Sequence, residues 1–338
     1  MKCHSGLLRP KGDDDMSLYE KIFDANRKAK ASRLSFGEKL AELGEKRKDI
    51  VALDGDLSKS TRTDLFAAKF PERFFNMGIA EANMIGVAAG LARADLVPFA
   101  ASFGCFLTGR FDQIRMSVAF TGAPVNLVGT HAGVGIGEDG HSQMALEDLT
   151  MMRSLPNMRV FHPAHEDEVH AFMDWTIDDA NPSYMRATRQ GLPALKSPQK
   201  DFAEGKWHVL HKAASKKSPV IVGTGAMLGP SVQAADILIK GGAFEDVSIV
   251  NASWINPVLE QSIDELLSLD PSFVVSIEDH YTVGGLGGLL AERLTDRGSG
   301  LRLLRIGVED FGQSGSPEDV YKHYGFTGEA LAARIKSL

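Results

Sequence analysis

One carboxyl and a pair of aromatic side chains have the types and spacing needed to bind and activate a flat organic ligand. Glu81 precedes a run rich in alanine and glycine, which favours a closely packed helix that could enclose the carboxyl. Phe103 and Phe106 follow a strand-like run and could form a wall against a ring. Both features also have ordinary explanations, because a first-turn Glu commonly stabilises the helix dipole and paired phenylalanines commonly fill a core.

A glycine-rich loop over residues 129–140 adds polar side chains to this set. Glycine lets the backbone approach a ligand closely. The polar side chains that this loop could offer to a ligand are those of His131, Asp139 and His141. A flexible surface loop is the alternative. However, the loop follows an apolar run that is typical of a buried strand. The loop is therefore a candidate binding loop.

Short strands that alternate with helices must position these residues. Strand-like runs lie at 50–54, 97–101, 124–129, 158–161 and 183–187, and helical patterns lie at 81–93, 111–120, 144–154 and 166–178. This alternation predicts an α/β fold with a largely parallel sheet. Ligands of such sheets bind beyond the carboxyl ends of the strands, so the candidate residues should meet at one edge.

A second, smaller α/β pattern follows a break in this rhythm. Residues 191–206 combine proline, glycine and mixed charge, as a linker would. Further strands are predicted at 219–222, 247–250, 273–277 and 301–306, and helices at 230–240, 285–294 and 328–337. We expect a polar leader and helical lead-in over 1–30, a domain over 31–190, the linker, and a second domain over 207–338. Each domain should contain a largely parallel sheet flanked by helices.

Composition favours a cytoplasmic globular protein and argues against several kinds of partner. With 43% apolar and 24% charged residues, the 338-residue chain can bury two cores. A net charge of −7 argues against nucleic acid, and neither a membrane-spanning run nor a secretory signal is present in the sequence. Cys3 and Cys105 do not suggest a disulfide framework. His165 and His170 are five apart rather than four, so we expect no metal site on this chain.

Several long motifs together resemble the transketolases, a family of thiamine diphosphate enzymes. The motifs are DGDLSKS (54–60), IAEANM (79–84), FDQIRM (111–116), THAGVGIGEDGHSQMALEDL (130–149), RATR (186–189) and IEDHYTVGGLG (277–287). They follow one another in the family's order and with similar spacing, over about nine-tenths of the chain. The resemblance implies a pyrimidine-binding domain followed by a transketolase C-terminal domain. It also implies transfer of a two-carbon ketol unit from a ketose phosphate to an aldose.

The resemblance assigns five residues to thiamine diphosphate. Glu81 matches the Glu that hydrogen-bonds N1′ of the aminopyrimidine, where a shared proton favours the imino tautomer that creates the thiazolium carbanion. Phe103 and Phe106 match the aromatic wall of the pyrimidine pocket, with Phe106 as the stacking partner. Asp56 would lie near the centre of the cofactor and Gln143 near its pyrimidine side.

A second set of residues matches those that bind the sugar phosphate in the family. Two guanidiniums and a hydroxyl suit a doubly charged phosphate, because arginine forms paired charge-assisted hydrogen bonds. The matching residues are Arg33, Ser60, His131 and Arg189, with Asp139 as the acid that reads a substrate hydroxyl. Gln143 departs from many microbial transketolases, which carry His at that place, and resembles the animal enzymes. His141 inherits no role.

The family's diphosphate-binding motif does not occur in this sequence. Transketolases hold the diphosphate through Mg²⁺ with a Gly-Asp-Gly motif and a downstream Asn. No Gly-Asp-Gly string is present here, and a complete transketolase is roughly twice this length. We therefore expect a partner subunit that carries the diphosphate-binding domain and the Mg²⁺. The expected assembly is α2β2, with active sites at the subunit junctions.

Three other interpretations stay open. The β subunit of a 2-oxoacid dehydrogenase E1 component shares the two-domain build but would not need the residues that bind the sugar phosphate. A 1-deoxyxylulose-phosphate synthase is a closer relative, although its loop matches residues 130–143 less well. A non-catalytic assembly subunit would need neither Glu81 nor Phe106. The sequence does not choose among the sugar phosphates, or between the pentose phosphate pathway and other carbohydrate metabolism.

Overall fold

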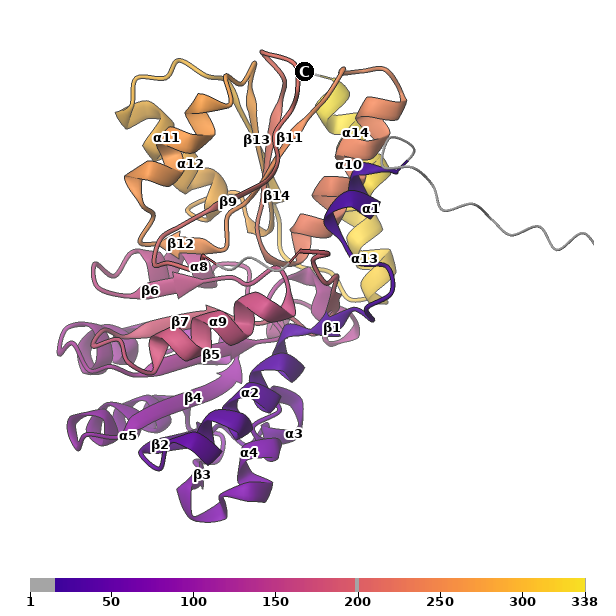
Figure 1. Ribbon diagram of the computed structural model, residues 1–338. Helices are drawn as coiled ribbons and strands as arrows, with labels where there is room; N and C mark the ends of the chain where they lie inside the picture. The colour runs from indigo at the N-terminus through magenta and orange to yellow at the C-terminus, as the bar shows by residue number, and fades with distance from the viewer. Residues whose placement is uncertain (1–15, 198–200, 338) are drawn as a thin grey trace, which may run out of the picture.

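The computed structural model describes residues 16–197 and 201–337, so the leader expected over residues 1–15 lies outside the described residues. The chain forms two layered α/β units, one around a seven-stranded sheet and one around a five-stranded sheet (Figure 1). Most neighbouring strands in both sheets are parallel, and helices flank both sheets. These features confirm the predicted fold class.

The seven-stranded sheet is built mainly from the first half of the chain and has the order β12-β6-β7-β5-β4-β2-β3. Its strands are β2 (Ile50–Asp54), β3 (Phe74–Asn76), β4 (Val97–Phe103), β5 (Asn126–Thr130), β6 (Arg159–Phe161), β7 (Ser183–Arg186) and β12 (Trp254–Asn256). Its helices are α2 (Ser32–Lys46), α3 (Ser58–Thr61), α4 (Asp64–Lys69), α5 (Glu81–Arg93), α6 (Gly104–Thr108), α7 (Phe111–Gln113), α8 (Asp148–Arg153) and α9 (Glu166–Thr176). The central strands β2 and β5 are buried throughout, as expected where helices cover both faces of a sheet.

The five-stranded sheet has the order β14-β13-β10-β11-β9 and is built from the second half of the chain. Its strands are β9 (His208–His211), β10 (Val220–Gly223), β11 (Ser248–Asn251), β13 (Val274–Tyr281) and β14 (Leu303–Val308). Its helices are α10 (Leu228–Lys240), α11 (Glu260–Ser268), α12 (Leu286–Asp296), α13 (Pro317–His323) and α14 (Gly328–Lys336). Figure 1 shows α11 and α12 on one side of this sheet and α10 and α14 on the other.

Segments that exchange between the two units tie them together. The edge strand β12 follows β11 in the chain, yet it pairs antiparallel with β6 of the seven-stranded sheet. Trp254 of β12 packs edge-on against Phe161 of β6, with ring centroids 5.1 Å apart. At the other end of the chain, α1 (Leu18–Ile22) packs on α10, and β1 (Lys30–Ala31) pairs with β8 (Gly191–Leu192). Each half therefore contributes to the packing of the other.

Two predicted helices differ from the structure. The helix expected over 111–120 is α7 followed by a π-helix over Ile114–Ala119, in which the amide of Phe120 donates to the carbonyl of Arg115. The helix expected over 144–154 begins only at Asp148. The carbonyl of Ala145 instead accepts hydrogen bonds from the Gly133 amide and from Arg186, which holds this stretch outside the helix.

The helices of residues 16–197 and 201–337 include none that is both long and apolar enough to pass through a membrane.

Candidate active site

The carboxyl ends of parallel strands bring the predicted residues to one edge of the seven-stranded sheet. β2, β4, β5 and β7 are neighbouring parallel strands and lie together at the centre of the sheet. Asp56 follows β2, Phe106 follows β4, His131 follows β5 and Arg189 follows β7. Four segments that are distant in sequence therefore meet where ligands of such sheets bind.

Glu81 is the first residue of α5, and its side chain is buried at this edge. Only 4% of the residue is exposed. Ser102 Oγ, in β4, donates a hydrogen bond to Glu81 Oε1 at 3.1 Å. Gly55 packs on the same oxygen, because a Cβ built there would lie 3.2 Å from it. No other hydrogen bond from the described residues reaches the carboxyl, so Oε2 is available to a ligand.

Two parallel aromatic rings follow Ser102 in the chain. The rings of Phe103 and Phe106 have centroids 5.7 Å apart and planes 7° apart. Phe103 is buried, whereas Phe106, in α6, is half-buried and offers the more accessible face. The imidazole of His131 lies 4.0 Å from the Phe103 ring, measured between centroids. Phe103 thus connects the carboxyl side of the site with the glycine-rich loop.

The guanidiniums of Arg33 and Arg189 lie near His131. Arg33 Nη1 donates to the carbonyl oxygen of Ser60 at 2.6 Å, so these two predicted residues are brought together. Arg189 Nη1 donates to the Ile136 carbonyl at 2.7 Å and lies 4.0 Å from Asp139 Oδ2. Burial and the positive charge of Arg189 lower the pKa of Arg33. An arginine remains charged under such a shift, so this side of the site is cationic.

His131 is held neutral between these groups. It lies in the left-handed region with φ 57° and is 4% exposed, and its Nδ1 is 3.0 Å from Thr130 Oγ1. Burial, together with the nearby charges of Arg33 and Arg189, lowers the pKa of His131 to about 3. A neutral imidazole can still donate one N–H to an oxyanion without adding a charge.

Asp56 and Gln143 lie apart from the hydrogen bonds of the other candidates, although the helical turn that contains Gln143 packs against α6, the helix of Phe106. Asp56 has φ 67°, and its Oδ1 accepts a hydrogen bond from Asn76 at the end of β3. Gln143 lies in the short helical turn His141–Gln143 and is half-buried. Among the described residues, no hydrogen bond joins either side chain to Glu81 or to the arginines.

A buried ionic cluster of Arg186, Asp148 and Asp279 packs against the glycine-rich loop. Arg186 Nε donates to Asp148 Oδ2 at 2.9 Å, and its Nη1 donates to Asp279 Oδ1 at 2.8 Å. All three residues are fully buried. Gly133, with φ 85°, lies directly over this cluster, because a Cβ there would come within 2.0 Å of Asp279 Oδ2. The loop therefore needs glycine at position 133 for both backbone and space.

The second half of the chain also covers this loop. The residues from Asp310 to Pro317, which we call the C-terminal brace, lie along residues 137–141. The Gly312 amide donates to His141 Nδ1 at 2.9 Å, and Phe311 packs edge-on against the same imidazole at 4.7 Å. Ser314 Oγ donates to the carbonyl of Glu138 at 2.6 Å. His141 thus contacts the second unit rather than the other candidate residues.

Sequence reasoning missed two polar residues of this edge. Ser102 lies within the strand that precedes Phe103 and is the hydrogen-bond partner of Glu81. Arg62 follows Ser60 by two positions and is close enough to Arg33 to lower its pKa. The nearby motif residues could have suggested both, but a serine in a strand and an arginine after a helix are individually common.

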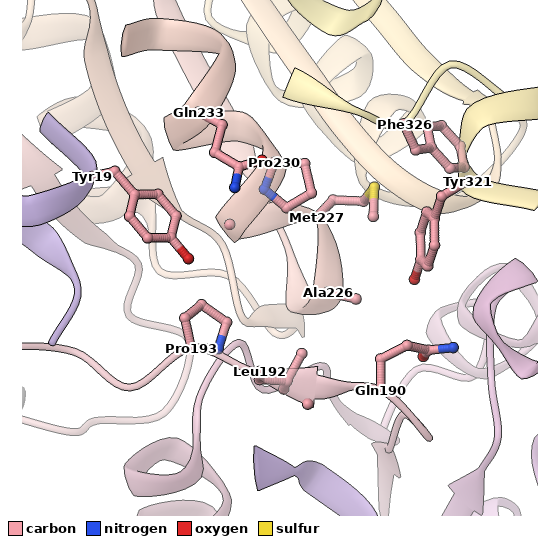
Figure 2. Close-up of a pocket in the computed structure, with 12 residues that line it drawn as sticks. Tyr19, Gln190, Leu192, Pro193, Ala226, Met227, Pro230, Gln233, Tyr321 and Phe326 are labelled. Carbon is pink, nitrogen blue, oxygen red and sulfur yellow. The ribbon is translucent and has the colours of Figure 1, made fainter. Parts of the chain in front are cut away.

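A separate cavity of about 220 Å³ lies where four other segments meet (Figure 2). Tyr19 of α1, Pro193, Gln233 of α10 and Tyr321 of α13 contribute to its walls. Figure 2 shows the Tyr19 hydroxyl and the Gln233 amide directed into this space. The residues predicted from the sequence do not line this cavity, so it is distinct from the candidate site.

Comparison with known protein families matches both units. The transketolase pyrimidine-binding domain matches residues 28–194, and the transketolase C-terminal domain matches residues 205–331. A protein of Methanocaldococcus jannaschii described as a transketolase C-terminal section is 40% identical over 310 residues, which cover 90% of this chain and 95% of that protein. Human transketolase is 34% identical over 314 residues, which cover 91% of this chain and 49% of the human protein. The chain thus spans about half the length of the mammalian transketolases that it matches.

Two solved transketolase structures also superpose on this chain. A split gene transketolase, described as an inactive β4 tetramer, superposes with a TM-score of 0.81 at 37% identity, covering 91% of this chain and 97% of that one. A transketolase from Campylobacter jejuni superposes with a TM-score of 0.79 at 24% identity, covering 96% of this chain and 49% of that one. The second likeness concerns the fold alone.

Proposed function

The chain belongs to the transketolase family, and from that premise we propose that it is the C-terminal subunit of a two-subunit transketolase. The reaction would transfer a two-carbon ketol unit from a ketose phosphate to an aldose phosphate. The observation that carries this proposal is the pairing of two groups of side chains at one sheet edge. Glu81 and the stacked rings form one group, and the arginines form the other, with His131 packed on Phe103 between them.

The residues present fit the aminopyrimidine of thiamine diphosphate. Glu81 has one carboxylate oxygen fixed by Ser102 and the other without a hydrogen bond from the described residues. The half-buried face of Phe106 is suited to stacking against a flat ring. A basic ring nitrogen at Oε2 could share a proton with the carboxyl. When bound, thiamine diphosphate supplies a carbon nucleophile and an electron sink next to a carbonyl.

The remaining residues of this chain bind and orient the sugar phosphate. Arg33 and Arg189 offer charge-assisted hydrogen bonds to a phosphate, and neutral His131 adds one donor. The Ser60 carbonyl holds Arg33 in place, and we propose that the Ser60 hydroxyl also binds the phosphate. Asp139, which is exposed and near Arg189, can accept a hydrogen bond from a sugar hydroxyl. We propose that Asp56 and Gln143 contact the cofactor only in the assembled enzyme.

We infer that a partner subunit supplies the diphosphate and Mg²⁺ half of the site. The sequence contains no Gly-Asp-Gly string. Two relatives that this chain covers almost completely carry descriptions as a transketolase C-terminal section and as a split gene transketolase. The second of these is described as inactive when it forms a β4 tetramer. An α2β2 assembly with the active sites at subunit junctions would complete the site.

Reconstitution tests this proposal. The purified chain, the proposed N-terminal subunit, and their mixture are each assayed for ketol transfer between a ketopentose phosphate and an aldopentose phosphate. Thiamine diphosphate and Mg²⁺ are added and omitted in turn. Activity should require both chains, the cofactor and Mg²⁺. Full activity of this chain alone would contradict the split arrangement, and an inactive, well-formed complex would contradict the reaction.

A further inference from the structure

Arg62 lies close to Arg33, one of the two arginines that the proposed function uses. We propose that Arg62 binds the dianionic phosphate of the sugar together with Arg33 and Arg189, and that it favours phosphorylated over unphosphorylated substrates. This inference rests on the proposed function and adds a specificity-determining residue to it.

Backbone packing fixes Arg62 next to Arg33. Arg62 caps the C-terminal end of the one-turn helix α3, which also contains Ser60, whose carbonyl accepts from Arg33. Gly37 lies one helical turn after Arg33 in α2, and therefore on the same face of that helix. A Cβ at Gly37 would lie 2.4 Å from the carbonyl oxygen of Arg62 and 2.5 Å from its Cβ. Only glycine at position 37 lets the chain at Arg62 approach this face so closely.

The backbone conformation of Arg62 favours a different residue type. Its φ is 73°, in the left-handed region that glycine and asparagine adopt most readily at the end of a helix. An arginine there is conformationally unfavourable, and such residues gather at functional sites. The backbone conformation therefore does not explain an arginine at position 62, whereas a functional role of its side chain does.

The guanidiniums are incompletely neutralised by the protein. The Nε atoms of Arg33 and Arg62 are buried and have no hydrogen-bond partner. Asp64 Oδ1 lies 3.4 Å from Arg62 Nε, but the geometry is that of an ion pair without a hydrogen bond. Arg33 forms no ion pair with the described residues, although the charges of Arg189 and Arg62 lower its pKa. Clustered positive charge with unused donors is the arrangement that a phosphate stabilises.

Glu138 and Asp139 do not remove this positive charge. They lie 3.6 and 4.0 Å from Arg189 Nη1, and both carboxylates are exposed to solvent. Exposed pairs at such distances contribute little. A divalent anion between the three arginines would meet donors from α2, from the end of α3 and from the segment after β7.

Binding of inorganic phosphate to the purified chain tests the proposal without any need for catalysis. Isothermal titration at constant ionic strength compares the wild type with Arg62→Asn and with the control Arg27→Asn. Arg27 also lies outside a helix and pairs with carboxylates, at 3.5 Å, but on another part of the surface. Arg62→Asn should weaken phosphate binding about tenfold, and Arg27→Asn should change it less than about twofold. Arg62→Lys should lie between wild type and Arg62→Asn.

Thermal unfolding separates a binding role from a structural one. Asparagine suits the left-handed conformation, so Arg62→Asn should melt at the wild-type temperature or slightly above it. A clear fall in melting temperature together with lost binding would make Arg62 structural and overturn the proposal. Unchanged phosphate affinity in Arg62→Asn, or no phosphate binding by the wild-type chain, would also overturn it.

The reconstituted complex separates this inference from the proposed reaction. Arg62→Asn should raise KM for an aldose phosphate acceptor more than KM for glycolaldehyde. If phosphate binding depends on Arg62 but the complex shows no ketol transfer, the reaction is wrong and the Arg62 assignment stands. If ketol transfer occurs and the two KM values change by the same factor, the specificity role of Arg62 is wrong.

Discussion

A neutral histidine beside arginines can donate a hydrogen bond to a phosphate without adding to the repulsion between the positive charges. Each guanidinium brings charge, while His131 brings a donor whose own charge is suppressed by burial and by Arg33 and Arg189. A protonated imidazole at this place would add repulsion within the free site. The affinity of the site for a sugar phosphate between pH 5 and 8 should therefore follow the second ionisation of the phosphate monoester, whose pKa is about 6, rather than the titration of His131.

The pH dependence of stability gives a direct test of this neutral state. The pKa of His131 is about 3 in the folded protein, below its ordinary value of 6.5. Below pH 6.5 the unfolded chain therefore binds a proton that the folded chain does not. The stabilising contribution is fully present above pH 6.5 and is lost as the pH falls towards 3. His131→Asn never takes up this proton, and asparagine tolerates the left-handed backbone at this position.

Urea unfolding at pH 6.5 and pH 4.5 should show the difference. We expect the wild type to lose roughly 2 kcal/mol more free energy of unfolding over this interval than His131→Asn does. The matched control is His323→Asn, at an exposed residue, which should show the wild-type loss. Identical losses in wild type and His131→Asn would show that His131 is protonated alike in both states.

Glu81→Gln tests the proton-sharing role of the buried carboxyl. Glutamine has the same shape and can still accept the hydrogen bond from Ser102, so the fold should be retained. It cannot exchange a proton with a ligand, and proton transfer by a positioned group contributes roughly 10²–10⁴ in rate. Turnover by the reconstituted complex should fall by at least about a hundredfold. The control is Glu72→Gln, which changes an exposed acid in the first turn of another helix and should keep wild-type turnover. Wild-type turnover in Glu81→Gln would contradict the proton-sharing role and favour a non-catalytic assembly subunit.

At the scale of elements, local signals predict the strands and helices that make mainly local contacts. The helix α5 has the predicted bounds because an acidic residue begins its Gly/Ala-rich run and Arg93 ends it, in agreement with the helix dipole. The late start of α8 was not predictable in this way. It depends on Arg186, a residue about forty positions downstream that binds the Ala145 carbonyl.

The candidate site likewise contains residues that local sequence predicts and residues that depend on long-range contacts. The alternating pattern predicted that Glu81, Phe103, His131 and Arg189 meet at one edge, because the carboxyl ends of parallel strands lie together there. The role of Gly37 in positioning Arg62 depends on two segments that touch only in the folded chain. Such contacts have no local signature, since neither glycine in a helix nor arginine after one is unusual.

The C-terminal brace makes a prediction at this scale. His141 links the loop of Asp139 and Gln143 to the brace through the Gly312 amide and the Phe311 ring. His141→Ala removes both contacts, which should cost about 1–2 kcal/mol of local stability. Hydrogen exchange should then be faster at Gly312 and across residues 137–143. The control His211→Ala removes a hydrogen bond with Asp246 at the edge strand β9, and should leave that exchange unchanged. Unaltered protection in His141→Ala would show that the brace does not hold the loop.

At the scale of the whole molecule, the two units are coupled by burial as well as by chain exchange. Arg186 of β7 bonds Asp279 of β13, so one side chain connects the seven-stranded and five-stranded sheets. The same guanidinium donates to the Asp279 carbonyl, and Tyr184 and Tyr321 add hydroxyl donors to the two acids. The candidate loop lies on this cluster through Gly133. The second unit therefore affects the site without contributing a candidate residue to it.

Replacing Arg186 should uncouple the two units. Arg186→Met keeps much of the side-chain volume but leaves Asp148 and Asp279 buried without their cation. Breaking a buried ion pair in this way costs about 3–5 kcal/mol, because an uncompensated charge remains in the interior. Urea unfolding should show this loss, and the transitions of the two units should separate. Arg297→Met removes exposed ion pairs with Glu260 and Asp264, and should cost less than about 1 kcal/mol.

Neutralising the two acids separates the charge penalty from lost packing. In the background of Arg186→Met, Asp148→Asn and Asp279→Asn remove the uncompensated charges while retaining oxygen acceptors for the tyrosine hydroxyls. The triple variant should recover more than half of the stability lost by Arg186→Met, since neutral polar groups cost less to bury than charges. If the triple variant is no more stable than Arg186→Met, then Arg186 stabilises the junction mainly through packing and its bonds to backbone carbonyls. In that case its two ion pairs would not be what couples the C-terminal unit to the loop of the candidate site.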